Sequence, residues 1–145
     1  MIKINVICVG KLKERYWREA CAEYEKRLSR FCRLTVRELP EKANPAAEAE
    51  EILKTLSGYV IALAVEGKRS SSEAFAAEIK RLFDAGLEIT FVIGSSCGLA
   101  PAVKARANAL CSFSEMTFPH QMFRVILLEQ LYRAFMINTG SEYHK

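Results

Sequence analysis

The end of the chain constrains the fold most strongly. Residues 119–138 read PHQMFRVILLEQLYRAFMIN, which predicts a helix that is apolar over most of its circumference and lies close to the terminus. A helix of this kind must be buried. One subunit rarely covers such a helix completely, so we expect a homodimer. The apolar positions form one broad face and a second patch: Val125, Leu127, Leu128, Leu131, Tyr132 and Phe135, and then Phe123, Ile126 and Ile137.

Strand and helix patterns alternate along the rest of the chain. Alternating or continuous apolar runs predict strands at 2–9, 34–39, 59–65, 87–93 and 110–113. Helical spacing and capping residues predict helices at 13–31, 45–56, 73–83, 101–109 and 119–138. Continuous apolar strands such as YVIALAV at 59–65 are covered on both faces. We therefore expect one α/β domain over residues 1–145, with a mainly parallel sheet and helices on both faces.

Three loops follow predicted strands, at 66–68, 94–99 and 114–119. Ligands of such sheets bind outside the carboxyl ends of the strands, so these loops should converge if their strands are neighbours. The 94–99 loop begins with Gly94, which permits close approach of a ligand. It matches neither GxGxxG nor a Walker motif, which argues against a standard dinucleotide site. A plain strand-to-helix turn explains this loop equally well.

The segment before the last helix has the composition of a binding loop. Ser114, Thr117 and backbone amides could bond the edge of a heterocycle, while Met116 and Phe118 supply apolar walls. It could equally be a capping loop in which Thr117 serves the helix that Pro119 opens, and both readings can hold together.

Arg124 projects into the apolar face of the last helix. A buried guanidinium needs partners, because an unpaired charge inside a protein is costly. The partner could be a ligand or RNA, and it could equally be a structural salt bridge or a backbone carbonyl.

Both histidines lie in the last quarter of the chain. His120 occupies the first turn of the final helix, where a capping or packing role is the preferred interpretation. His144 lies in the closing tail with Tyr143 and Lys145, and Gly140 permits the chain to turn back. An aromatic ring, an imidazole and an ammonium together predict a working tail.

Charge and cysteine content narrow the class of protein. The net charge is +4, and residues 1–37 contain ten Lys and Arg against four Glu. This basic segment, with Lys11, Lys13 and Arg15, could bind a polyanion; a solvated helix face is an equal alternative. The five cysteines lack CxxC spacing, which predicts reduced thiols, no metal site and a cytoplasmic location. We recognise neither a signal peptide nor a membrane-spanning run.

Several stretches together resemble the ribosomal large-subunit pseudouridine N3-methyltransferases of the SPOUT superfamily. The resemblance covers the whole chain, and its most specific block is FSEMTFPHQMFRVILLEQLYRAF. The other matching stretches are GKLKERYW at 10–17, EYEKRL at 23–28, LAVEGK at 63–68, FVIGSSCGL at 91–99 and YHK at 143–145.

The resemblance implies a C-terminal trefoil knot, a homodimer and S-adenosylmethionine bound in the knot. By matching positions, the cofactor site should comprise Leu63, Gly94, Phe113, Ser114, Glu115, Met116, Thr117 and Phe118. The implied substrate is a pseudouridine in a hairpin of large-subunit (23S) rRNA, methylated at N3 in the assembled ribosome.

From this we assign roles to the tail and to the basic residues. His144 would handle the N3 proton, Arg133 and Lys145 would hold the RNA or the developing anion, and Tyr143 would stack on the base. Arg124, together with Lys11, Lys13 and Arg15, would contact RNA. These residues and the cofactor pocket should come from different subunits.

Ser95 departs from the family pattern, which usually has a second glycine after Gly94. Ser95 adds a Cβ near the expected cofactor site. One alternative is therefore a dimeric module that binds ribosomes or RNA but does not catalyse methyl transfer. A small-molecule α/β enzyme is a third reading. Binding of S-adenosylmethionine and the salt dependence of RNA binding would separate the three.

Overall fold

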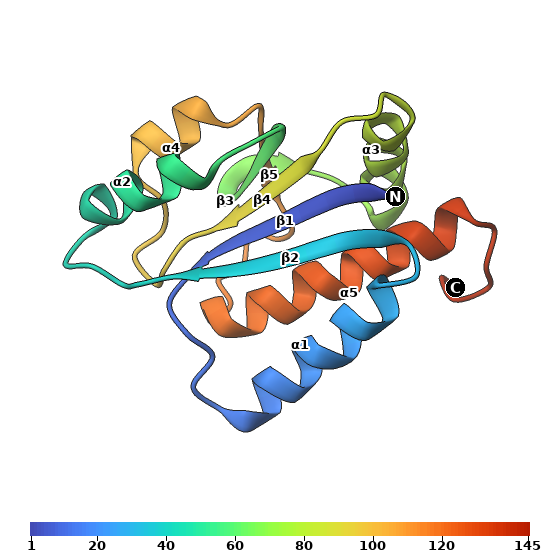
Figure 1. Cartoon of the computed structure of the whole chain (residues 1–145), viewed down its shortest axis with the longest axis horizontal. Coiled ribbons are helices and arrows are strands. Elements are labelled where there is room, and N and C mark those ends of the chain that lie inside the picture. Colours follow the sequence, from blue (N-terminus) through green and yellow to red (C-terminus); the bar gives the residue numbers. More distant parts are fainter.

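The computed structural model describes residues 1–145 and contains one sheet of five parallel strands in the order β2-β1-β4-β3-β5 (Figure 1). Each strand is a run of apolar or alternating residues, as expected for a sheet covered by helices. The strands are β1 (Ile2–Val9), β2 (Cys32–Leu39), β3 (Tyr59–Arg69), β4 (Ile89–Ile93) and β5 (Ala109–Ser112).

Helices cover both faces of this sheet (Figure 1). Helices α1 (Arg15–Leu28), α3 (Ser72–Asp84) and α5 (His120–Asn138) build the larger core on one face. Helices α2 (Pro45–Thr55) and α4 (Pro101–Arg106) build a smaller core on the other. The predicted α/β class, with a parallel sheet between two helical layers, is confirmed. None of the helices is both long and apolar enough to cross a membrane.

Local sequence explains where several helices begin. The Asn44 side chain accepts a hydrogen bond from Ala47 N at 2.9 Å, and Pro45 occupies the first turn of α2. Ser71 caps α3 in the same way, accepting from Ala74 N at 3.0 Å. These caps satisfy backbone donors that a helix start otherwise leaves unpaired.

Two elements differ in length from the prediction for reasons of tertiary pairing. Strand β3 continues to Arg69, because it pairs with β5 again after a register shift between Leu63 and Lys68. Helix α4 ends at Arg106 instead of 109. Asn108 then bonds β3 twice, since its backbone N–H donates to Val60 O and its side chain accepts from Val60 N, both at 2.8 Å.

Helix α5 lies under the sheet between α1 and α3 (Figure 1). Leu127, Leu128 and Leu131 are fully buried, and every residue from His120 to Ile137 is at least half-buried. The chain's own helices therefore cover much of the apolar surface. The homodimer stays a prediction.

Candidate active site

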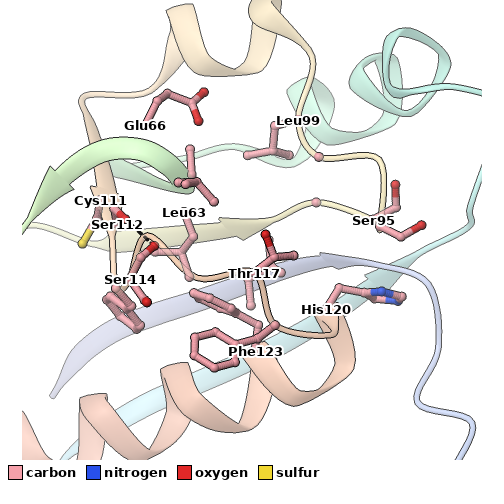
Figure 2. Close-up of a pocket in the computed structure, with 18 of the residues that line it drawn as sticks. Leu63, Glu66, Ser95, Leu99, Cys111, Ser112, Ser114, Thr117, His120 and Phe123 are labelled. Atoms are coloured by element: carbon pink, nitrogen blue, oxygen red, sulfur yellow. Dashed lines mark hydrogen bonds between the residues drawn. The ribbon is translucent and has the colours of Figure 1, made fainter.

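A cavity of about 670 Å³ lies at the carboxyl ends of β3, β4 and β5 (Figure 2). Its walls come from the ends of β3 and β5, the 94–99 loop, the 112–119 segment and the start of α5. These three strands are neighbours in the sheet, in the order β4-β3-β5. The predicted convergence is confirmed for the 94–99 and 114–119 loops, since parallel neighbours direct their carboxyl ends to the same edge. The predicted 66–68 loop is instead part of β3, which runs to Arg69, and only its Glu66 lines the cavity.

The 94–99 loop folds back on itself tightly. A Cβ on Gly94 would lie 2.7 Å from Gly98 O and 2.8 Å from Gly98 C, closer than real Cβ contacts. Gly98 closes the turn with φ +81°, and its N–H donates to Ser95 O at 2.9 Å. Gly94 is thus required by the loop itself, which is a different reason from the ligand approach expected from the sequence.

Ser95 is bound to helix α2. Its hydroxyl donates to Glu48 Oε1 at 3.0 Å, and the other carboxylate oxygen of Glu48 accepts from Lys42 N at 3.1 Å. Glu48 is only 3% exposed, so these hydrogen bonds partly offset the cost of burying its charge. Sequence reasoning missed Glu48. An acidic residue in the first turn of α2 was its only signal, and nothing in the sequence linked it to the loop.

The 112–118 segment is held by short-range hydrogen bonds. Ser112 Oγ donates to Ser114 O at 3.0 Å, and Met116 N donates to Ser114 Oγ at 2.9 Å. Met116 and Thr117 are exposed at the cavity mouth. No side chain caps α5, so the expectation that Thr117 caps this helix is wrong.

Aromatic rings form the floor of the cavity. Phe113 contacts Phe75 of α3 with ring centroids 5.5 Å apart and stacks on Phe123 of α5 at 5.6 Å. Phe118 adds a further contact with Phe123 at 6.2 Å. These contacts tie the segment to α3 and α5, so one wall of the cavity rests on rigid helices.

Seven of the eight residues predicted to bind a cofactor line this cavity. The eighth, Glu115, lies outside the lining and forms an exposed ion pair with Arg69 at 3.0 Å. The seven that line the cavity are Leu63, Gly94, Phe113, Ser114, Met116, Thr117 and Phe118.

Few titratable groups face the cavity. His120 Nε2 lies 3.8 Å from Glu41 Oε1, and Glu66 pairs with Lys104 at the rim. The hydrogen bond from Lys104 lowers the pKa of Glu66. The lining thus combines apolar walls with hydroxyl and backbone groups, and His120 is its one imidazole.

The tail forms a polar cluster at the other end of α5. His144 Nε2 lies 2.7 Å from Glu73 Oε1, and its Nδ1 lies 3.0 Å from Arg133 Nη1. Arg133 also donates to Glu129 at 2.7 Å, and its guanidinium lies 5.0 Å from the centre of the Tyr143 ring. Arg133, Tyr143 and His144, the predicted catalytic residues, thus lie together.

The electrostatics of this cluster follow from its contacts. The hydrogen bond with His144 lowers the pKa of Glu73, and the bond to Glu129 raises the pKa of Arg133. Burial raises the pKa of Tyr143. Lys145 is exposed at the end of the chain.

The two sets of predicted site residues are far apart within one chain. Helix α5 has 19 residues, so its ends are separated by roughly 27 Å at about 1.5 Å per residue. The cavity adjoins the first turn of α5, and the tail follows its last turn. No tail residue lines the cavity.

The residues predicted to contact RNA have different environments. Arg124 is 3% exposed, and it donates to Glu38 Oε2 at 2.6 Å and to Gly10 O at 3.1 Å. Arg124 therefore forms both the structural salt bridge and the backbone-carbonyl bond that were alternatives from the sequence. The two bonds join α5 to β2 and to the end of β1. A guanidinium enclosed in this way is not available to RNA, so we do not carry Arg124 forward as an RNA contact.

The three basic residues of the N-terminal loop and α1 are exposed. Arg15 pairs with Glu19 at 2.7 Å, which leaves Lys11 and Lys13 without an acidic partner. The backbone N–H of Lys13 donates to Gln121 Oε1 at 3.1 Å, so this loop lies against the start of α5.

Comparison with known proteins was made over the whole chain. The family model described as "Predicted SPOUT methyltransferase" matches residues 2–144. Two similar curated proteins are each described as "Ribosomal RNA large subunit methyltransferase H". The one from Lactobacillus acidophilus is 49% identical over 159 aligned positions, and the one from Levilactobacillus brevis is 50% identical. Both alignments cover 99% of this chain and 100% of the relative.

Solved structures share the fold at much lower identity. A probable methylase family protein from Haemophilus influenzae Rd KW20 superposes with a TM-score of 0.63 at 13% identity, over 100% of this chain and 72% of that chain. The SpoU methyltransferase AviRb of Streptomyces viridochromogenes, solved in complex with AdoMet, gives a TM-score of 0.52 at 10% identity, over 97% of this chain and 59% of that one.

Proposed function

This chain belongs to the SPOUT methyltransferase family, and from that premise we propose that it methylates large-subunit ribosomal RNA with S-adenosylmethionine as methyl donor. The finer proposal is transfer to N3 of a pseudouridine in the assembled ribosome. The observation that carries it is the joining of the Gly94 loop and the 113–118 segment around one cavity, in a chain about half identical to large-subunit rRNA methyltransferases.

The residues around the cavity fit this cofactor. Ligand sites are commonly about 300–1,000 Å³, mostly apolar, with a few polar groups, and the cavity has these properties. Leu63, Leu99 and Phe118 would enclose the adenine, and backbone groups of the 113–118 segment would bond its edge. When bound, S-adenosylmethionine supplies an electrophilic methyl group.

We propose that each active site is shared by two chains of a homodimer. Arg133, Tyr143 and His144 line no part of the cavity, and Arg133 follows the cavity residue Phe123 by ten positions, roughly 15 Å along α5 at about 1.5 Å per residue. A tail from the partner subunit would supply the missing groups. The trefoil knot is part of the same proposal and rests on the family resemblance.

To act as a base, His144 must change its hydrogen bonds. N3 of pseudouridine carries an imide proton between two carbonyls and must lose it to become nucleophilic. Arginine only donates hydrogen bonds, so Nδ1 of His144 accepts from Arg133, and Nε2–H donates to Glu73. Neither nitrogen is then free to accept a proton. His144 must leave Arg133 when the tail engages RNA, which exposes the Nδ1 lone pair as a base.

The other tail residues would hold the substrate. Arg133 and Lys145 would stabilise the anion that develops on the base, and Tyr143 would stack on its face. These contacts would hold N3 in line with the methyl group. Such alignment of the reacting atoms raises the rate of transfer.

One experiment tests this function directly. The protein is incubated with labelled S-adenosylmethionine and ribosomes from a strain lacking this methyltransferase, and the label is mapped by mass spectrometry. We expect one labelled pseudouridine in large-subunit rRNA, with N3 methylated. Cofactor binding by calorimetry without any label in RNA would favour a small-molecule enzyme, and absence of both would favour the non-catalytic module.

A further inference from the structure

The end of α1, the following turn and β2 carry an unusual run of charge. Residues 26–37 read KRLSRFCRLTVR, with five basic residues and no acidic one. Arg27 pairs with Glu23 at 2.7 Å. The other four, Lys26, Arg30, Arg33 and Arg37, are exposed and form no ion pair with any carboxylate of this chain. Their charge is therefore available to a partner.

Strand β2 presents part of this charge on an uncovered face of the sheet. It is an edge strand that pairs only with β1. Cys32, Leu34 and Val36 pack toward the core formed with α1 and α5. Since side chains alternate along a strand, Arg33 and Arg37 point to the opposite face, where they are exposed beyond the cover of α2 and α4.

A third cation lies directly beside this pair. The register places Lys3 of β1 opposite Arg33 of β2; Lys3 forms an ion pair with Glu88 at 3.8 Å, whereas Arg33 has no acidic partner. Like charges opposite one another on neighbouring strands are destabilising unless something compensates them. A phosphate backbone would compensate them, because it brings one negative charge per nucleotide.

One end of this surface, at the α1–β2 turn, lies near the tail. Phe31, in the turn after α1, contacts Tyr132 with ring centroids 6.3 Å apart, and Tyr132 contacts Tyr143 at 4.9 Å. The α1–β2 turn and the C-terminus lie at the same end of the molecule (Figure 1). An RNA strand held by the tail would therefore meet the cations of the turn first, and it would pass over the edge strand β2 to reach Arg33 and Arg37 on the other face of the sheet.

We propose that Lys3, Lys26, Arg30, Arg33 and Arg37, here named the α1–β2 basic surface, bind the phosphate backbone of ribosomal RNA beside the nucleotide that the tail addresses. This rests on the proposed function and extends it, because it locates the RNA path on one subunit. It adds an RNA contact to the predicted one at Lys11 and Lys13, which lies at the other end of α1. Its phosphate contacts would contribute to affinity but would not distinguish one base from another.

The test compares two double variants that remove the same charge. Arg33→Gln/Arg37→Gln alters the α1–β2 basic surface. Lys54→Gln/Arg106→Gln removes two exposed cations from α2 and α4, outside both the surface and the cavity lining. Binding to ribosomes and to a deproteinised rRNA fragment is measured from 50 to 200 mM KCl. Methyl transfer, cofactor affinity and Tm are measured in parallel.

We expect the surface variant to lower the magnitude of the slope of log K against log salt by about 1.4–1.8, since two phosphate contacts are lost and each contributes about 0.7–0.9. Affinity at 50 mM KCl should fall on the order of 10-fold or more, for ribosomes and rRNA alike. KM should rise while kcat and cofactor affinity stay unchanged, and the control should match the wild type.

Two results would overturn the proposal. Equal salt slopes for both variants would show that these arginines touch no phosphate. Weaker binding to ribosomes but not to naked rRNA would assign the surface to a ribosomal protein. Failure of the proposed function has a different signature, namely a wild-type protein that puts no methyl group into rRNA, and the salt slopes report on the surface even then.

Discussion

The two ends of helix α5 differ in chemistry. Its first turn adjoins a cavity walled by Leu63, Phe113 and Phe118, with few ionisable groups. Its last turns and the tail carry an ion pair, an imidazole and a tyrosine in contact, but they line no cavity of comparable size. One end adjoins an enclosed volume, and the other carries a cluster of charged and aromatic side chains.

The difference supports the proposal that one chain holds two halves of a site. A rigid helix keeps the halves apart, since a rise of about 1.5 Å per residue allows no folding back over 19 residues. A second copy could bring the cavity of one chain to the tail of the other. Variants can break either half, or the link between the halves.

Removal of the tail should have the largest effect. Deleting residues 143–145 should lower methyl transfer by on the order of 1,000-fold, the middle of the range for loss of acid–base and positioning groups. Cofactor binding measured by calorimetry should be unchanged, because the cavity remains whole.

Mixing variants tests whether the halves come from different chains. A tail-deleted chain combined with a Gly94→Leu chain forms hybrids in which one cavity and one tail remain intact. We expect activity to reappear on mixing, and its absence in verified hybrids would contradict a shared site.

Gly94→Leu should weaken cofactor binding by on the order of 100-fold or more. Its Cβ would approach Gly98 O to 2.7 Å, so the loop must open and lose its shape. Gly86→Ala is the control: Gly86 has open space around it and lies away from the cavity, and its φ of +71° makes Ala strained there, so it reports the effect of glycine replacement on stability alone. If Gly94→Leu bound S-adenosylmethionine normally, the 94–99 loop would not be the cofactor loop.

The bond between Ser95 and Glu48 should have a smaller effect. Ser95→Ala should raise the Kd for S-adenosylmethionine about 3- to 10-fold, consistent with a hydrogen bond worth about 0.5–1.5 kcal/mol. Ser72→Ala is a matched control, since it also removes one serine bond, to Gln130 at 2.8 Å, away from the cavity. Equal Kd changes in the two variants would argue that the bond only stabilises the fold.

Thiol chemistry should separate the cavity from the core. Cys97 is exposed in the 94–99 loop, whereas burial raises the pKa of Cys8 and Cys32 to about 12 and of Cys21 and Cys111 to about 11. Iodoacetamide near pH 8 should alkylate Cys97 first, and S-adenosylmethionine should slow the reaction. Peptide mass spectrometry against time measures both, and early labelling of Cys8 would contradict this packing.

The buried thiols should make the free energy of unfolding depend on pH in the alkaline range. Their folded pKa values lie above the unfolded value of 9.0, so their contribution is complete below pH 9.0 and is lost as pH rises through about 11 to 12. The urea midpoint should therefore be lower at pH 10 than at pH 8. Replacing Cys8 and Cys32 with Ala should reduce this difference.

The sequence predicted all ten elements because the apolar period in each was clear. It also predicted that the loops after β4 and β5 converge, but it placed a loop at 66–68, where β3 continues to Arg69. It did not predict the Ser95–Glu48 and Arg124–Glu38 bonds, which join residues 47 and 86 positions apart. Such contacts depend on how α2 and α5 pack against the sheet, and no local sequence pattern encodes this packing.

The sequence by itself determined the class of fold, the burial of the last helix and the family, because periodicity and motifs are local properties of the chain. Only the tertiary structure decided that Arg124 is a clamp, that Gly94 serves the loop's own closure, and that the tail and the cavity lie at opposite ends of α5. These outcomes depend on distances between segments remote in sequence, which packing sets.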